Sequence, residues 1–117
     1  MPYATQAAPK GSAVQYAIDP AIKKYALRDV GFVETKQGNF QWIRPLDPTP
    51  QIETGYKFKL TISKDLKGLK MSIVTRDGLS SVDIFHSKRE DADMIQEKFQ
   101  FYMNHLLQRH ILTVVES

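Results

Sequence analysis

The sequence predicts an α+β fold, in which a curved antiparallel sheet of about five or six strands packs on a long C-terminal helix. Short segments in the middle of the chain alternate between apolar and polar residues, which is typical of strands with one buried face. Residues 88–109 instead carry an apolar stripe at helical spacing. A helix of this kind needs an apolar surface to cover it, and a one-sided sheet supplies that surface. The 117 residues are enough for one domain, which we expect at residues 13–117 after a loose lead-in at residues 1–12.

A first strand and a short helix are predicted near the start of this domain. Residues 13–18 alternate between apolar and polar side chains. Asp19 suits the N-cap of a helix, and Pro20 suits its first turn. Gly31 suits the left-handed residue that closes a helix. We therefore expect a helix over residues 20–30.

Antiparallel strands joined by turns are predicted to follow. Gln37, Gly38 and Asn39 are typical of a hairpin, because Gly and Asn accept positive φ angles. Residues 46–55 hold two of the six prolines and are predicted to form a loop. Further strands are predicted over residues 56–63, 69–75 and 79–85, with turns between them.

The long helix has the clearest local signals in the chain. Ser87 and Glu90 have the spacing of a capping box, which predicts that the helix begins near Lys88. Apolar side chains then recur three or four residues apart, and the pattern ends near Arg109. Residues 111–115 are strand-like and are expected to pack back on the domain.

The composition is that of an ordinary soluble domain, and it excludes several classes of site. Hydrophobic residues make up 42% of the chain and charged residues 25%, close to the averages for globular proteins. The absence of cysteine excludes disulfides, thiolate catalysis and cysteine-ligated metal sites. No apolar run is long enough to span a bilayer, and the N-terminus lacks the pattern of a secretory signal. We therefore expect a cytoplasmic protein.

Three classes of enzymatic site also lack a supporting motif. His105 and His110 lie five residues apart, which separates them around a helix, and His86 stands alone, so no metal site is predicted. No nucleophile-elbow motif contains any of the serines, and no glycine-rich phosphate loop occurs. We expect no cofactor and favour a protein that is not an enzyme.

Lysines gather on the predicted strand pair in the middle of the chain. Lys57 and Lys59 are predicted to point away from the long helix, because the apolar residues between them point toward it. A nucleic acid or another polyanion could bind this face through four candidate residues, Lys57, Lys59, Lys67 and Lys70. The alternative is an ordinary solvated face, because the aromatic residues of the strand are in phase with the core rather than with the lysines.

Two other pairs of residues are candidates for binding. Trp42 and Arg44 lie on a strand with apolar residues on both faces, so we expect either core packing or contact with a protein partner. The predicted loop at residues 46–55 would extend that surface. Tyr102 and His105 would line a pocket if the sheet and the long helix enclose one, although side chains are expected to fill that space in a domain of this size.

Three segments of the chain carry a resemblance to known proteins. They read "DPAIKKYALRDVGF", "FQWIRPLDP" and "HSKREDADMIQEKFQFY". Over essentially its whole length, the chain resembles an uncharacterised family of small proteins from lactic acid bacteria, known only as a domain of unknown function. The order of its predicted elements resembles the TATA-binding-protein-like and helix-grip folds. The resemblance implies this fold, a bacterial cytoplasmic setting and an association with amino-acid or sulfur metabolism, and it implies no catalytic residues.

The leading functional hypothesis is a non-enzymatic interaction or accessory module that binds a protein partner through Trp42 and Arg44. A first alternative is nucleic-acid or polyanion binding through the lysine-rich sheet face. A second is small-ligand binding between sheet and helix, near Tyr102 and His105. The net charge of +3 is too mild to decide among them.

Overall fold

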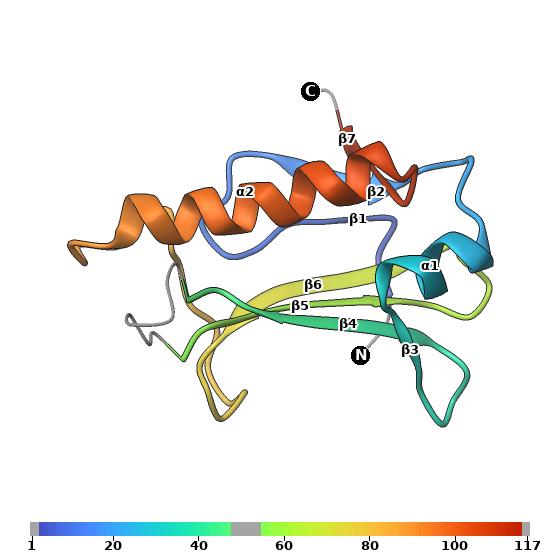
Figure 1. Ribbon diagram of the computed structural model, residues 1–117, viewed down its shortest axis with the longest axis horizontal. Coiled ribbons are helices and arrows are strands. Elements are labelled where there is room, and N and C mark those ends of the chain that lie inside the picture. Colours follow the sequence, from blue (N-terminus) through green and yellow to red (C-terminus); the bar gives the residue numbers. More distant parts are fainter. Residues whose placement is uncertain (1–2, 48–54, 116–117) are drawn as a thin grey trace.

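The computed structural model describes residues 3–47 and 55–115, and it confirms the α+β class with antiparallel sheets and a long C-terminal helix. The three-stranded sheet has the order β1 (Gln6–Ala7), β2 (Gln15–Ile18) and β7 (Leu112–Val115). The four-stranded sheet has the order β3 (Val33–Glu34), β4 (Phe40–Pro45), β5 (Lys57–Ile62) and β6 (Leu69–Val74). Helix α1 (Lys24–Val30) connects β2 to β3, and α2 (Ala92–Gln108) runs along one face of the four-stranded sheet (Figure 1).

The strands divide between two sheets because the two ends of the chain pair with each other. The chain reverses after α2 at His110, whose φ is 58°, and β7 then pairs with β2, with Leu112 opposite Ile18. The segment expected as a lead-in also takes part in both sheets. Its strand β1 pairs with β2, and Ala4 forms a bridge with Leu69, the first residue of β6. The N-terminal segment therefore links the two sheets.

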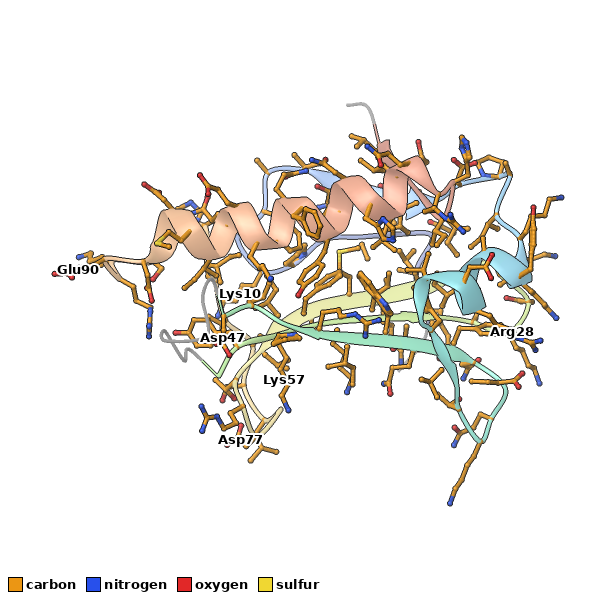
Figure 2. All side chains as sticks on the ribbon, in the orientation of Figure 1. Lys10, Arg28, Asp47, Lys57, Asp77 and Glu90 are labelled. Carbon is orange, nitrogen blue, oxygen red and sulfur yellow. The ribbon has the colours of Figure 1, made fainter. Side chains whose placement is uncertain are left out.

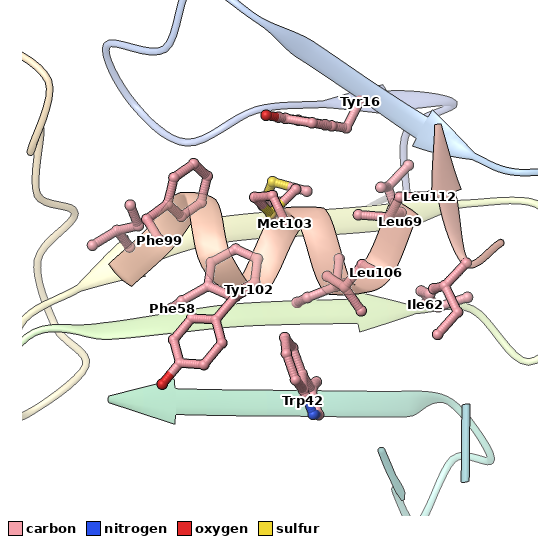
Figure 3. Packing of buried hydrophobic residues seen from close by; sticks show 14 of the residues in the cluster. Tyr16, Trp42, Phe58, Ile62, Leu69, Phe99, Tyr102, Met103, Leu106 and Leu112 are labelled. Carbon is pink, nitrogen blue, oxygen red and sulfur yellow. The ribbon is translucent and has the colours of Figure 1, made fainter. Parts of the chain in front are cut away.

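The core lies between α2 and the inner face of the four-stranded sheet (Figure 3). The buried large side chains of α2 recur at the predicted helical spacing: Ile95, Phe99, Tyr102, Met103 and Leu106. They meet alternate residues of β5 and β6, and these are also buried: Phe58, Leu60, Ile62, Leu69, Met71 and Ile73. The alternation of the sequence therefore predicted correctly which face of this strand pair packs on the helix.

The prediction of a strand over residues 79–85 is wrong. This segment forms a single bridge, between Ser81 and Val74, and then bends. The carboxylate of Asp83 accepts hydrogen bonds from the backbone N–H groups of Phe85 and His86, at 2.9 and 3.1 Å. A side chain that satisfies nearby backbone groups in this way competes with a strand ladder for the same groups.

Helix α1 is shorter than predicted at its start and ends as predicted. It begins at Lys24 rather than at residue 20, because the Asp19 carboxylate accepts a hydrogen bond from the N–H of Ala21 at 2.8 Å and closes a separate turn. Gly31 closes the helix in the left-handed conformation, with a φ of 111°. Its N–H donates to the carbonyls of the last helical turn.

Helix α2 begins at Ala92, and the capping box predicted for Ser87 and Glu90 is wrong. The Ser87 hydroxyl instead accepts a hydrogen bond from the N–H of Arg89 at 3.2 Å, before the helix begins. The Arg89 guanidinium pairs with the Asp91 carboxylate at 2.8 Å, which orders the residues just before the first turn. Neither helix in the described part of the chain has the length and apolar content that crossing a membrane requires.

The hairpin predicted around Gly38 joins β3 to β4. Gly38 has a φ of 90°, and the N–H of Thr35 donates to the carbonyl of Asn39 at 2.7 Å. The predicted loop at residues 46–55 lies mostly outside the described residues. At its base, the N–H of Leu46 donates to the carbonyl of Tyr56 at 2.9 Å and continues the pairing of β4 with β5.

The hydroxyl of Tyr102 joins α2 to β4, because it donates to the carbonyl of Pro45 at 2.8 Å. We expect Tyr102→Phe to lower the free energy of unfolding by about 1 kcal/mol, since the substitution removes one hydrogen bond and leaves the ring in place. Urea unfolding measures this difference. Tyr25→Phe is the control, because Tyr25 is exposed and the change is expected to stay within about 0.5 kcal/mol. Equal effects of the two substitutions would contradict a role for the Tyr102 hydroxyl.

Candidate functional site

Three of the four predicted lysines, Lys57, Lys59 and Lys70, lie on the outer face of the four-stranded sheet, meaning the face away from α2. Strand pairing sets two rows of residues on it: Gln41, Thr61 and Lys70 in one row, and Ile43, Lys59 and Ser72 in the next. Lys57 follows along β5 and extends from the sheet on the side away from the helix (Figure 2). Along each strand, residues of the outer face therefore alternate with the buried residues of the inner face.

One end of this face is hollowed. The hollow has a volume of about 500 Å³. Its lining combines two ammonium groups with hydroxyl and amide side chains and one aromatic ring: Tyr3, Thr35, Gln37, Asn39, Gln41, Lys59, Thr61, Lys70 and Ser72. We call these nine residues the outer-face hollow. They come from the N-terminal segment, the β3–β4 hairpin, the middle strand β5 and the edge strand β6.

Two cations share the outer-face hollow without a compensating acid. Lys59 pairs with Ser72, and Thr61 pairs with Lys70, so the two lysines stand diagonally on neighbouring strands. Such diagonal neighbours have side-chain origins about 7–8 Å apart. Among the residues that the structure describes, no carboxylate lines the hollow and neither ammonium takes part in an ion pair. The two ammonium charges repel each other, and a bound anion between them would remove that repulsion.

Tyr3 forms one wall of the outer-face hollow. The Lys70 Nζ lies 4.6 Å from the centre of the Tyr3 ring, which is a cation–π contact. The backbone beside the ring is held by two hydrogen bonds between Ala4 and Leu69, at 3.1 and 2.9 Å. Gly68 leaves the space for this approach, because a Cβ at that position would lie 2.5 Å from the Cβ of Tyr3.

The β3–β4 hairpin forms the opposite wall, and its polar groups are oriented. The side-chain oxygen of Asn39 accepts a hydrogen bond from the N–H of Lys64 at 3.0 Å. This bond fixes the orientation of the Asn39 amide, whose NH₂ group carries two hydrogens that can donate. The Thr35 hydroxyl oxygen accepts from the backbone N–H of Asn39 at 3.2 Å, so its own hydrogen is available to donate. The wall therefore offers hydrogen-bond donors.

Of the four predicted lysines, the structure brings together Lys59 and Lys70. Lys57 lies on the same face, paired between Pro45 and Val74, but outside the hollow. Lys67 belongs to the turn before β6, where its N–H donates to the Asp65 carboxylate at 3.0 Å. A hydrogen bond from the Ser63 hydroxyl, joined by the N–H and charge of Lys67, holds the pKa of Asp65 below its usual range.

Of the two candidate residues for a protein partner, Trp42 belongs to the core and Arg44 packs against it at intermediate exposure. Trp42 is 3% exposed, stacks on Phe32 with ring centres 5.7 Å apart, and donates to the carbonyl of Val30 at 3.3 Å. The Arg44 guanidinium lies over the Trp42 ring at 4.6 Å and donates to the carbonyls of Val30 and Ile43, at 3.4 and 2.9 Å. Trp42 thus offers almost no surface to a partner, and Arg44 satisfies carbonyls at the end of α1 and in β4.

Tyr102 and His105, the candidates for a pocket between sheet and helix, point in different directions. Tyr102 is buried against Trp42, and burial raises the pKa of its hydroxyl in spite of the nearby Arg44 charge. His105 is exposed to solvent. The side chains of Phe58 and Met103 occupy the space between helix and sheet (Figure 3). The structure therefore does not bring these two candidates together.

Several residues of the outer-face hollow were missed in the sequence. Tyr3 lies in the segment expected as a lead-in, and only its pairing next to Leu69 brings it to Lys70. The amide residues Gln37, Asn39 and Gln41 were a recognisable signal, because they recur at every second position through the hairpin. Alternation of this kind sets side chains on one face once strands pair.

The chain is similar to known proteins over nearly all of its length. The model of the family DUF1831, described as "Putative amino acid metabolism", matches residues 1–113. The crystal structure of a DUF1831 family protein from Lactobacillus plantarum is similar to this chain, with 34% sequence identity and a TM-score of 0.85. The match covers 98% of this chain and 99% of that protein. Among curated proteins, no relative was found.

Proposed function

The chain belongs to the DUF1831 family, and from this premise we propose that it is a binding module for a small anionic ligand of amino-acid metabolism. The resemblance to a family of unknown function from lactic acid bacteria is confirmed by the same membership. The family description is the source of the metabolic setting. The binding role is argued from the outer-face hollow.

The observation that carries this proposal is the convergence of Lys59 and Lys70 in a hollow that no described carboxylate lines. A negatively charged ligand would pair with both ammonium groups and remove their mutual repulsion. Hydroxyl and amide groups beside the lysines, such as those of Thr61 and Asn39, would donate to its remaining oxygen atoms. The hollow thus combines positive charge with hydrogen-bond donors, which suits an anion.

The size of the hollow supports a small molecule over a nucleic acid. Ligand pockets of about 300–1,000 Å³ suit small molecules, and this hollow of about 500 Å³ falls within that range. Single-stranded nucleic acids are bound by extended cationic grooves in which several aromatic side chains stack on successive bases. Here Tyr3 is the aromatic residue in the hollow, and Lys70 already contacts its ring.

We expect Lys59→Ala and Lys70→Ala each to weaken anion binding by at least about tenfold, because each removes a hydrogen bond between charged groups, which contributes about 1.5–3 kcal/mol. Citrate and inorganic phosphate are the probes. Isothermal titration measures their affinity, and amide chemical shifts locate the binding. Lys57→Ala is the matched control, since it removes the same charge from the same face of β5 outside the hollow.

The dependence of the anion affinity on salt concentration is a second test of the same site. Binding through exposed lysines should weaken as ionic strength rises, because added ions screen the attraction. Equal loss of affinity in Lys57→Ala and Lys59→Ala would point to general charge rather than to the hollow. If neither citrate nor phosphate binds at low salt, the proposal is overturned.

The protein partner predicted from Trp42 and Arg44 stays a prediction, and the burial of Trp42 weakens its basis. A partner would have to meet other residues, since the Trp42 ring is covered by Phe32 on one face and the Arg44 guanidinium packs over the ring. The cytoplasmic setting also stays a prediction.

A further inference from the structure

We infer that the ligand of the outer-face hollow is a small dicarboxylate that lacks an ammonium group, rather than a free amino acid. This inference rests on the proposed anion-binding function and narrows its ligand class. It follows from three properties of the hollow: the two lysines, the donor groups around them, and the engaged face of the Tyr3 ring.

The two lysines favour a ligand with two acid groups. Lys59 and Lys70 extend from diagonal positions whose origins are about 7–8 Å apart. Each ammonium is a compact charge on a flexible four-carbon chain, so the pair can adjust to two carboxylates joined by a short linker. A ligand with a single carboxylate would leave one ammonium without a partner, or would place both on one group.

The remaining polar groups favour oxygen acceptors in the ligand. The Asn39 oxygen accepts a hydrogen bond from the N–H of Lys64, at 3.0 Å, and the NH₂ group of this side chain carries two hydrogens that can donate. The Thr35 hydroxyl oxygen accepts from the N–H of Asn39, at 3.2 Å, so its hydrogen is available to donate. Carboxylate oxygens accept hydrogen bonds and match these donors, whereas an ammonium group only donates.

An ammonium group on the ligand would be disfavoured for two reasons. It would enter a site that already holds two cations, and no described residue of the lining is a carboxylate that could pair with it. Proteins also bind ammonium groups over aromatic rings, but Lys70 Nζ already lies 4.6 Å from the ring of Tyr3. The geometry thus selects against a zwitterionic amino acid.

Three related molecules test this ligand class. Glutarate has two carboxylates joined by three carbon atoms. Butyrate has the same three carbon atoms but one carboxylate. Glutamate is glutarate with an added α-ammonium group. We expect glutarate to bind at least about tenfold more tightly than either of the others. Isothermal titration at low ionic strength measures the three affinities, and amide shifts of β5, β6 and the β3–β4 hairpin locate each ligand.

Lysine variants connect the preference to the hollow. In Lys59→Ala and in Lys70→Ala, the ratio of glutarate affinity to butyrate affinity should fall toward one, because a single ammonium remains for either ligand. In Lys57→Ala, the ratio should stay as in the unmodified protein, since this lysine lies outside the hollow. A merely structural role of the lysines would lower both affinities together and leave the ratio unchanged.

Contrary outcomes separate the inference from the proposed function. Equal binding of glutamate and glutarate would overturn the exclusion of an ammonium group, and equal binding of butyrate and glutarate would overturn the second acid group. Both results would leave anion binding intact if Lys59 and Lys70 were still required. If none of the three ligands binds while inorganic phosphate binds through Lys59, the dicarboxylate class is wrong. If no anion binds at all, the proposed function itself fails.

Discussion

Trp42→Ala is expected to lower the free energy of unfolding by about 3–5 kcal/mol, the usual cost of removing a large aromatic side chain from a core. Trp42 is 3% exposed and joins three parts of the core. Its ring stacks on Phe32 and meets Phe58 and Tyr102 edge to face, with ring centres 6.1 and 5.5 Å away. The substitution would leave a cavity between β4, β5, α2 and Phe32.

The same substitution also removes two polar contacts. The Trp42 Nε1–H no longer donates to the carbonyl of Val30, and the Arg44 guanidinium loses the ring beneath it. Domains of this size have a total stability of about 5–15 kcal/mol, so the variant could lose a large part of it. Urea unfolding followed by circular dichroism measures the loss.

Phe101→Ala is the matched control for this prediction. Phe101 is also aromatic, but it is 65% exposed on α2, so its removal should change the stability by no more than about 0.5 kcal/mol. A loss below about 1 kcal/mol in Trp42→Ala would contradict its place in the core. It would also restore Trp42 as a candidate for contact with a partner.

Gly68→Ala is expected to lower the free energy of unfolding by about 1–3 kcal/mol and to weaken anion binding several-fold, because the added methyl group overpacks the site. The new Cβ would lie 2.5 Å from the Cβ of Tyr3, next to the backbone. Rotation of the tyrosine side chain cannot relieve that contact, so the N-terminal segment must move. Such a movement would disturb the bridge from Ala4 to Leu69 and the contact of Tyr3 with Lys70.

A double variant separates this mechanism from general damage to β6. Tyr3→Gly removes the atom that the new methyl group would meet, so Gly68→Ala should cost much less stability in that background than in the unmodified protein. Anion binding should stay weak in the double variant, because the Tyr3 wall is gone. If Gly68→Ala costs the same stability with and without Tyr3, the close approach of the N-terminal segment is not the cause.

The elements that were predicted correctly are those whose signal lies within a few residues. Alternation from Lys57 to Ile62 indicated both the strand and its buried face, because a strand sends successive side chains to opposite sides. The apolar spacing through Phe99 and Leu106 likewise indicated α2 and its buried stripe. The predictions that were wrong also depended on contacts within a few residues. Asp83 accepts hydrogen bonds from nearby backbone groups where a strand was predicted, and Ser87 accepts from the N–H of Arg89 where a capping box was predicted, so both alternatives are local.

The candidate site shows what the sequence by itself determined and what only the tertiary structure decided. The sequence determined that Lys57 and Lys59 face away from the core, because that follows from the period of one strand. The register between β5 and β6 decided that Lys70, rather than Lys57, accompanies Lys59 in the hollow. Pairing of the N-terminal segment with the edge of β6 supplied Tyr3 from more than sixty residues away along the chain. Periodicity acts within one element, whereas register and long-range pairing depend on how the whole core packs, and so only the folded chain brought these groups together.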